Sequence, residues 1–232
     1  MNTASPAIEA LADDAWLLQF GDTIDAATNA RVHALAATVR APAPAWLRDL
    51  VPGYASLGVF FDTTAVSADH ARDWLLRQVA ALPDEGVVEK NQRTIEIPVV
   101  YGGEFGPDLE SAAMELGLSP QTLAQRHAAG EYVVAMIGFA PGFPYLSGLD
   151  PALALPRLAT PRTLVPAGSV AIGGAQTGIY PRESPGGWRL LGRTPLTLFD
   201  PYRTMPALLS PADRVRFRAI DSDEFAQLAR DA

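Results

Sequence analysis

The chain has 232 residues and a mass of 24.7 kDa, which suits one large domain or two small ones. An apolar fraction of 48% and a charged fraction of 19% exclude a mostly disordered chain. The absence of cysteine excludes disulfides, thiolate nucleophiles and cysteine-based zinc sites, and the three histidines are too scattered to suggest a metal site.

The net charge of −8 argues against a general nucleic-acid binder, but this charge is unevenly distributed. Residues 1–92 contain 12 acidic and 6 basic residues, whereas residues 157–218 contain 9 arginines and 3 acidic residues. Because arginine holds carboxylate and phosphate groups through planar, bidentate contacts, the second segment is a candidate anion-binding region. The alternative is a set of ordinary surface arginines in a chain with one lysine.

No apolar run reaches the roughly 18–20 residues that a membrane helix needs. Residues 1–14 have neither the basic patch nor the continuous apolar stretch of a secretory signal. We therefore expect a cytoplasmic protein that binds neither membranes nor nucleic acid.

The first ninety residues alternate strand and helix patterns. Apolar runs and period-two alternation predict strands, and apolar residues at helical spacing predict helices. The predicted strands cover residues 15–20, 46–51, 54–61 and 93–101, and the predicted helices cover residues 25–40 and 67–82. This order, β-α-β-β-α-β, predicts a two-layer α/β sandwich with helices on one face of a mainly antiparallel sheet.

The pattern then changes to short apolar pieces separated by glycine and proline. Two short helices are expected at residues 106–117 and 119–130, and the remainder is expected to be β structure with a C-terminal helix at residues 223–230. Strands are predicted at residues 131–137, 169–172, 188–191, 196–199 and 214–220. Such punctuation is typical of a β-barrel or sandwich. We predict an α+β chain with one domain at residues 1–90, a second at 91–232 and a linker near 84–93.

The sequence lacks the common motifs of nucleotide and acyl-transfer enzymes. There is no Walker A loop, no dinucleotide-binding unit around Gly173 and Gly174, and no Gly-x-Ser-x-Gly elbow. Lys90 lacks the hairpin context of a biotin-carrying lysine. We therefore expect no nucleotide enzyme in this chain alone, no metal site and no cofactor bound to the isolated chain.

The candidate site residues lie in and around the glycine- and proline-rich loops. Glycine lets a ligand approach the backbone, proline fixes loop shape, and polar side chains aimed inward would hold the ligand. The candidates for substrate binding are Arg157, Arg162, Ser184 and Arg189, and the candidates for catalysis are Gln176, Tyr180 and His127. The alternative is a loop-rich barrel whose turns simply need glycine and proline.

His127 is the only histidine in the second half and hence the one candidate there for a base near neutral pH. It also lies in the last turn of a predicted helix, where the helix dipole favours a cation. A structural role for His127 is therefore the alternative.

A set of motifs spread over nearly the whole chain resembles the KipI/allophanate hydrolase subunit 1 family. The motifs are residues 20–22, 54–57, 98–103, 106–109, 138–146, 161–170, 176–181, 184–188 and 192–196. The resemblance implies an N-terminal α/β domain and a C-terminal cyclophilin-like β-barrel. It also implies a partner of the KipA type.

Three functions occur in that family, and the resemblance leaves them open. The first is the B subunit of an ATP-dependent 5-oxoprolinase, which cleaves 5-oxo-L-proline to L-glutamate with a KipA-type subunit (PxpC) and a LamB/YcsF-type subunit (PxpA). ATP, with magnesium, would then bind through the assembled complex. The second is a KipI-like inhibitor of a sensor histidine kinase, and the third is half of a biotin-dependent urea or allophanate-type carboxyltransferase. We expect the first.

Overall fold

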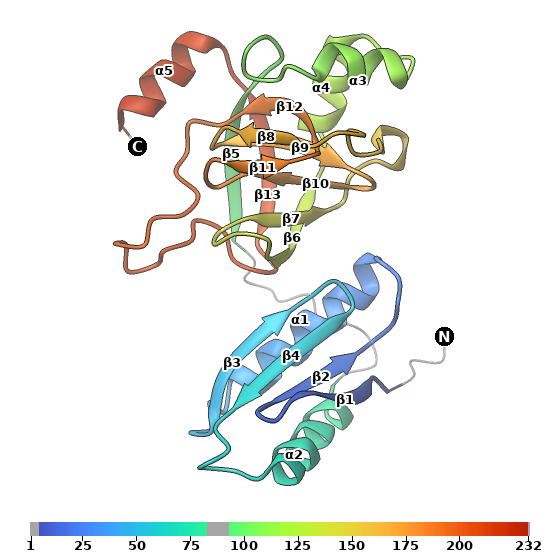
Figure 1. Cartoon of the computed structure of the whole chain (residues 1–232), viewed down its shortest axis with the longest axis vertical. Coiled ribbons are helices and arrows are strands. Elements are labelled where there is room, and N and C mark those ends of the chain that lie inside the picture. The colour runs from blue at the N-terminus through green and yellow to red at the C-terminus, as the bar shows by residue number, and fades with distance from the viewer. Residues whose placement is uncertain (1–4, 83–92, 232) are drawn as a thin grey trace. The chain divides into compact units, whose positions relative to one another are not determined.

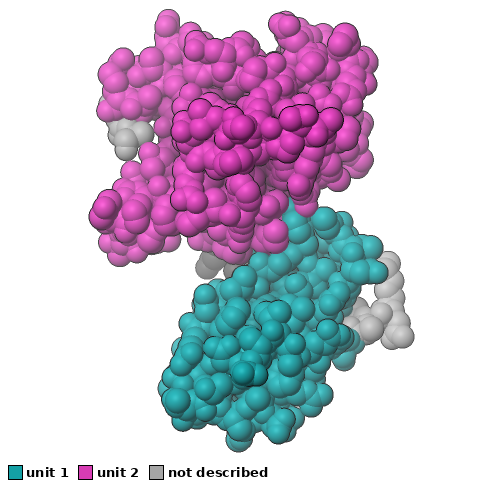
Figure 2. Space-filling model, in the orientation of Figure 1, with its two compact units in different colours: residues 1–91 teal, residues 92–232 magenta. Residues whose placement is uncertain are grey.

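A computed structural model describes residues 5–82 and 93–231 of the chain. The chain divides into two compact units, residues 1–91 and 92–232, which are coloured separately in Figure 2. The predicted linker at residues 84–93 lies, apart from Arg93, outside the described residues. No helix within the described ranges is both long enough and apolar enough to cross a membrane.

Unit 1 is the predicted two-layer α/β sandwich. Its four antiparallel strands have the spatial order β1 (Ala7–Ala12), β2 (Ala15–Gln19), β4 (Ser56–Phe61) and β3 (Leu47–Pro52), as Figure 1 shows. The helices α1 (Ala26–Arg40) and α2 (Ala68–Ala80) share one core with the sheet. Leu57 and Val59 of the sheet, Leu35 of α1 and Leu75 of α2 are all fully buried in it.

Both helices of unit 1 begin at a side-chain cap. The carboxylate of Asp25 accepts a hydrogen bond from the backbone N–H of Thr28 at 2.8 Å, and the hydroxyl of Ser67 accepts one from the N–H of His70 at 3.3 Å. Such caps satisfy donors that the first helical turn leaves unpaired. They confirm the helix starts predicted from the sequence.

The predicted strand order of unit 1 is wrong in two places. Strand β1 was not predicted, because three of its six residues are alanine, which favours helices over strands. It forms a hairpin with β2, in which Ala12 pairs with Ala15. Strand β5 (Thr94–Tyr101), predicted as the last strand of this sheet, instead belongs to the barrel of unit 2.

Unit 2 is a closed seven-stranded barrel, which confirms the predicted fold class. In spatial order its strands are β10 (Gln176–Ile179), β7 (Pro144–Ser147), β6 (Tyr132–Ile137), β13 (Arg214–Ala219), β5, β12 (Arg189–Arg193) and β9 (Ser169–Gly173). Strand β13 pairs with β5 in parallel, and the other neighbours are antiparallel. The unit also contains the helices α3 (Leu109–Glu115), α4 (Pro120–Ala128) and α5 (Ser222–Asp231).

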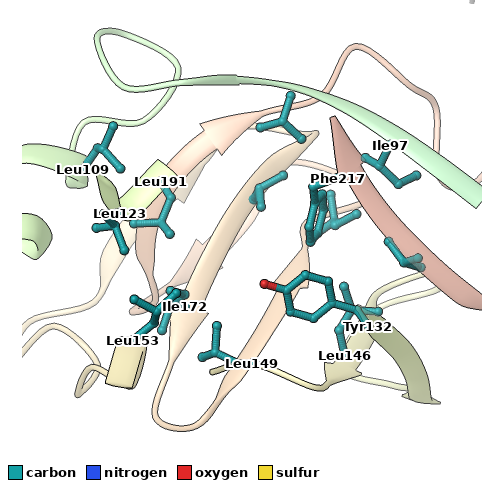
Figure 3. Close-up of a cluster of buried hydrophobic side chains, with 14 of the residues drawn as sticks. Ile97, Leu109, Leu123, Tyr132, Leu146, Leu149, Leu153, Ile172, Leu191 and Phe217 are labelled. Atoms are coloured by element: carbon teal, nitrogen blue, oxygen red, sulfur yellow. The ribbon is translucent and has the colours of Figure 1, made fainter. Parts of the chain in front are cut away.

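The barrel interior is filled by apolar side chains from both strands and helices (Figure 3). Ile97, Leu146 and Ile172 come from strands, and Leu109 and Leu123 come from α3 and α4. Helices α3 and α4 therefore close the barrel core by contributing side chains to it.

A separate two-stranded ribbon consists of β8 (Arg162–Val165) and β11 (Ser184–Gly186). We refer to it as the β8–β11 ribbon. It was not predicted, and neither were β7 and β10, because each of these strands has only three or four residues. The strand predicted at residues 196–199 is wrong: Pro195 just before it cannot donate to a ladder, and the segment forms one isolated bridge, between Phe199 and Ala207.

Candidate functional site

Five aromatic side chains pack together on the outer side of the barrel wall. This aromatic cluster consists of Phe139, Phe143, Tyr145, Tyr180 and Trp188. Their ring centroids are 4.9–6.2 Å apart, mostly in edge-to-face geometry, which is favourable for aromatic pairs. The cluster shares its core with Ala171 and Leu190, whose strand neighbours Ile172 and Leu191 face the barrel interior.

Glycines in the barrel wall make room for these rings. A Cβ added to Gly173 would lie 2.5 Å from the indole of Trp188, and one added to Gly178 would lie 3.1 Å from the ring of Phe143. The glycine-rich sequence here therefore serves close packing of aromatic rings against strands, which favours the structural alternative for these two glycines.

Phe139 is the exposed member of the aromatic cluster. Its side chain is 63% exposed and its φ angle is +64°, in the left-handed region that bulky residues rarely adopt. The backbone around it is fixed by hydrogen bonds, since Gly138 N–H donates to Phe143 O and Phe143 N–H donates to Ala140 O. Strain held at an exposed aromatic residue is typical of functional loops.

The β8–β11 ribbon lies against the hydroxyl end of Tyr180. In the ribbon, Ser184 pairs with Val165 and Gly186 pairs with Arg162. A Cβ added to Gly186 would lie 2.3 Å from the Tyr180 hydroxyl oxygen, so the ribbon approaches this side chain as closely as glycine allows. Tyr180 is thereby held between the barrel wall and the ribbon.

Burial raises the pKa of the Tyr180 phenol, although a hydrogen bond from the backbone N–H of Trp188 and the positive charges of Arg157 and Arg162 act in the opposite direction. Burial likewise raises the pKa of Tyr145, against the charge of Arg157. Both phenols are therefore protonated at neutral pH and can donate a hydrogen bond.

Arg162 connects the ribbon to the start of α3. Its Nη2 donates to Oδ1 of Asp108 at 2.6 Å, and Oδ2 of Asp108 accepts from the backbone N–H of Leu190 at 2.7 Å. The Arg162 side chain is 29% exposed and that of Asp108 is 9% exposed. Asp108 was not among the predicted site residues, because its position before a helix is also that of an ordinary cap.

Arg157 lies over the face of Trp188, with its guanidinium carbon 5.9 Å from the ring centroid. Gln176 is on β10, where alternation puts it on the same face as Gly178 and Tyr180. The structure therefore brings five of the predicted residues, Arg157, Arg162, Gln176, Tyr180 and Ser184, to the outer wall and the ribbon.

Arg189 is on β12 but does not join this group. Its Nη2 donates to Glu115 at 2.9 Å, and its Nε donates to the carbonyl of Pro156 at 3.2 Å. Alternation puts it on the opposite face of the strand from Leu190, which packs with the aromatic cluster. Arg189, a predicted substrate-binding residue, therefore lies apart from Arg157, Arg162 and Ser184.

The positive charge of residues 157–218 is largely paired. Five of its nine arginines form ion pairs with acidic residues, most of them outside that segment: Arg162, Arg189, Arg203, Arg216 and Arg218. These ion pairs offset part of the positive charge that the composition of the segment suggests.

His127 is fully buried inside unit 2, with both ring nitrogens hydrogen-bonded. Thr177 donates its hydroxyl proton to Ala171 O, so it must accept from Nε2 of His127 at 2.9 Å. Nδ1 is then an acceptor, and Tyr101 donates to it at 2.8 Å. Burial lowers the pKa of His127 to about 3. These are the surroundings of a neutral structural histidine rather than of a base that meets substrate.

Within the described ranges, no group of three or more histidine, aspartate or glutamate side chains could hold a metal ion. The polar groups gathered beside the aromatic cluster are guanidiniums, hydroxyls, one amide and the carboxylate of Asp108, whose oxygens are taken by Arg162 and by the Leu190 N–H. This set suits anions and amides better than cations.

The sequence matches a known family model over most of its length. Residues 6–209 match the family described as "Carboxyltransferase domain, subdomain C and D". The chain is 43% identical over 233 residues to the B subunit of 5-oxoprolinase from Bacillus subtilis, and the match covers 94% of both chains. It is 58% identical over 130 residues to the B subunit of 5-oxoprolinase from Escherichia coli O157:H7, covering 56% of this chain and 60% of that protein.

Solved structures share the fold. The crystal structure of TTHA0988 is 43% identical in sequence and has a TM-score of 0.76. The match covers 90% of this chain but only 40% of the TTHA0988 chain. The urea carboxylase of Kluyveromyces lactis has a TM-score of 0.75 at 18% identity, over 100% of this chain and 23% of that one, and shows the fold alone.

These matches confirm the family resemblance drawn from the sequence motifs. The chain belongs to the family of the carboxyltransferase domain, subdomains C and D, and within it is similar to the B subunits of 5-oxoprolinases.

Proposed function

We propose that this chain is the B subunit of a multi-subunit, ATP-dependent 5-oxoprolinase that cleaves 5-oxo-L-proline to L-glutamate. The observation that carries the proposal is the 43% identity to the B subunit of 5-oxoprolinase from Bacillus subtilis over 94% of both chains. A match over nearly the whole length of both proteins supports a shared role better than a match to one domain does.

The reaction explains why ATP and several subunits are needed. An unstrained lactam is a poor electrophile, and phosphorylation of its oxygen by ATP would make the ring carbon reactive toward water. The reaction consumes one water to open the C–N bond and one to release phosphate from ATP. The enzyme must therefore hold a carboxylate, stabilise charge at the lactam oxygen and admit water.

The groups around the aromatic cluster supply part of that requirement. Arg157 and Arg162 can interact with anions, and the protonated phenols of Tyr145 and Tyr180 can donate to an amide or developing oxyanion. ATP and magnesium would bind through the assembled complex, since this sequence has no Walker A motif.

The partners in this proposal are a KipA-type subunit and a LamB/YcsF-type subunit, in the cytoplasm. The curated relatives are named as one lettered subunit of 5-oxoprolinase, which implies further subunits in their complexes. The isolated chain would then bind part of the substrate but not turn it over.

Genetic replacement tests the proposal. The gene for this chain would replace the gene for the 5-oxoprolinase B subunit in Bacillus subtilis, and consumption of 5-oxo-L-proline by cell extract would be measured with ATP. We expect consumption to be restored relative to the strain lacking its own B subunit. The proposed function would be rejected if extracts contained the folded chain at the normal level and still did not consume 5-oxo-L-proline.

A carboxyltransferase component is the second candidate, because the matched family takes its name from that domain. The link to urea amidolyase is narrower: 37% identity over 75 residues, 30% of this chain. Carboxyl transfer from biotin to urea by the chain with its KipA-type partner would favour this candidate.

A further inference from the structure

Two polar atoms in the β8–β11 ribbon are buried without a hydrogen-bond partner among the described residues. They are Nη1 of Arg162 and Oγ of Ser184, each with under 1 Å² of exposed surface. Buried polar atoms in native proteins are nearly always paired, so two unpaired ones in one short ribbon need an explanation.

The strand pairing brings both atoms into one short ribbon beside Tyr180. Ser184 and Gly186 are two residues apart on β11 and so face the same side of the ribbon. Across the ribbon, Arg162 pairs with Gly186 and Val165 pairs with Ser184, with a bulge or irregularity between the two pairs. A Cβ on Gly186 would lie against the Tyr180 hydroxyl, so the Arg162 pair lies beside that phenol. In Figure 1 the ribbon crosses in front of the barrel strands that carry this cluster.

Each of the three side chains can donate a hydrogen bond to a ligand. Nη2 of Arg162 is engaged by Asp108, which fixes the guanidinium and leaves Nη1 unused. The Ser184 hydroxyl can rotate its proton toward a ligand, and the Tyr180 phenol is protonated and lies close enough to Arg162 to sense its charge. A fixed guanidinium beside two hydroxyls matches an oxyanion and disfavours a cation.

We propose that Arg162, Ser184 and Tyr180 form a subsite beneath the β8–β11 ribbon that binds an oxyanion, a carboxylate or a phosphoryl group. The identity of the ligand rests on the proposed function. Under that function, the bound oxyanion is either the carboxylate of 5-oxo-L-proline or the phosphoryl group of an activated intermediate. Arg189, paired with Glu115 on the other face of β12, is not part of it.

Among the described strands, the ribbon is a sheet of its own, with no ladder to a barrel strand. Side-chain and loop contacts fix it in place, among them the Arg162–Asp108 ion pair and the bond from Leu158 N–H to Gly187 O.

Binding to the full chain tests the subsite directly. The chain would be titrated separately with 5-oxo-L-proline, with its carboxamide and with inorganic phosphate, following the indole N–H signal of Trp188 by NMR. Assignment comes from loss of that signal in Trp188→Phe. If the carboxylate is the ligand, 5-oxo-L-proline binds and its carboxamide does not; if a phosphoryl group is the ligand, phosphate binds.

Two variants assign the binding to the named atoms. Ser184→Ala should weaken the Kd about tenfold, with an unfolding temperature equal to or above that of the parent, because the hydroxyl has no partner in the described structure. Arg162→Lys, which keeps the charge but removes Nη1, should weaken the Kd by a similar factor. The control variants are Ser147→Ala and Arg216→Lys, because the Ser147 and Arg216 side chains have partners elsewhere. Both should leave the Kd within about twofold of the parent value.

The subsite is wrong if neither 5-oxo-L-proline nor phosphate binds, or if Ser184→Ala binds as tightly as the parent. The proposed function fails separately. Anion binding that depends on Ser184, together with a replacement strain that does not consume 5-oxo-L-proline, would keep the subsite and reject the function.

Discussion

Asp108 and Arg162, 54 positions apart in sequence, form a 2.6 Å hydrogen-bonded ion pair that joins the start of α3 to the β8–β11 ribbon. Asp108 also accepts the backbone N–H of Leu190 in β12. One mostly buried carboxylate thus holds together three elements that surround the aromatic cluster.

Asp108→Ala should lower the free energy of unfolding by about 3 kcal/mol, because it leaves the Arg162 guanidinium and the Leu190 N–H without their acceptor. Urea denaturation of the full chain measures this. The matched control is Glu131→Ala, which removes an exposed pair with Arg216 and should cost less than about 1 kcal/mol. If the two variants lost equal unfolding free energy, the Asp108–Arg162 pair would contribute no more to stability than an exposed ion pair.

Two adjacent glycines offer a sharp steric comparison. In Gly186→Ala the new methyl would lie 2.3 Å from the Tyr180 hydroxyl, whereas in Gly187→Ala the nearest atoms lie 3.6 Å away. We expect Gly186→Ala to cost about 1–3 kcal/mol of unfolding free energy and Gly187→Ala to be nearly neutral. Thermal unfolding of both variants measures these costs. If Gly187→Ala were as destabilised as Gly186→Ala, the close approach of the ribbon to Tyr180 would be contradicted.

The left-handed backbone of Phe139 makes glycine the better replacement there. Phe139→Gly and Phe139→Ala lose the same ring contacts, but only glycine relieves the strain of a φ of +64°. We predict that Phe139→Gly is about 1 kcal/mol more stable than Phe139→Ala. Tyr202, 96% exposed and without a positive φ, serves as control: there alanine should be at least as stable as glycine. Urea denaturation measures the unfolding free energies. If Phe139→Ala were as stable as Phe139→Gly or more stable, the backbone at residue 139 would not be strained.

The sequence predicted the elements whose signals are local. The helices predicted to start at residues 25 and 67 do begin there, at the caps Asp25 and Ser67, and the change to glycine- and proline-punctuated strands identified the barrel. It did not predict β1, whose alanines carry no strand signal, nor the three- and four-residue strands of the ribbon and β10, which are shorter than any periodic pattern.

The candidate site was less predictable, because pairing between distant residues leaves no local signal. Arg162 and Arg189 are alike in sequence, yet Asp108 holds one beside the aromatic cluster and Glu115 holds the other on the opposite face of β12. His127 has the residue type of a base, but the barrel encloses it completely. Which side chains converge is decided by strand register, and register follows from the complete fold.

His127 should make stability depend on pH in a defined window. Burial lowers its pKa to about 3, whereas in the unfolded chain it is about 6.5, so the unfolded chain takes up the proton first. The stabilisation is complete above about pH 6.5, falls by about 1.4 kcal/mol per pH unit below it, and levels off below about pH 3. Comparing the parent with His127→Gln from pH 7.5 to 4.5 isolates this contribution. The stability difference between them should shrink as the pH falls; a constant difference would mean that His127 does not titrate as its burial requires.

We propose that this chain is one indispensable part of an ATP-dependent 5-oxoprolinase. A reconstitution assay tests this: the purified chain is mixed with purified KipA-type and LamB/YcsF-type subunits, 5-oxo-L-proline and ATP, and L-glutamate formation is measured. Each component is then omitted in turn. We predict glutamate formation, with matching ATP hydrolysis, only when all three are present. Turnover by this chain alone, full activity in its absence, or no activity in the complete mixture would contradict the claim.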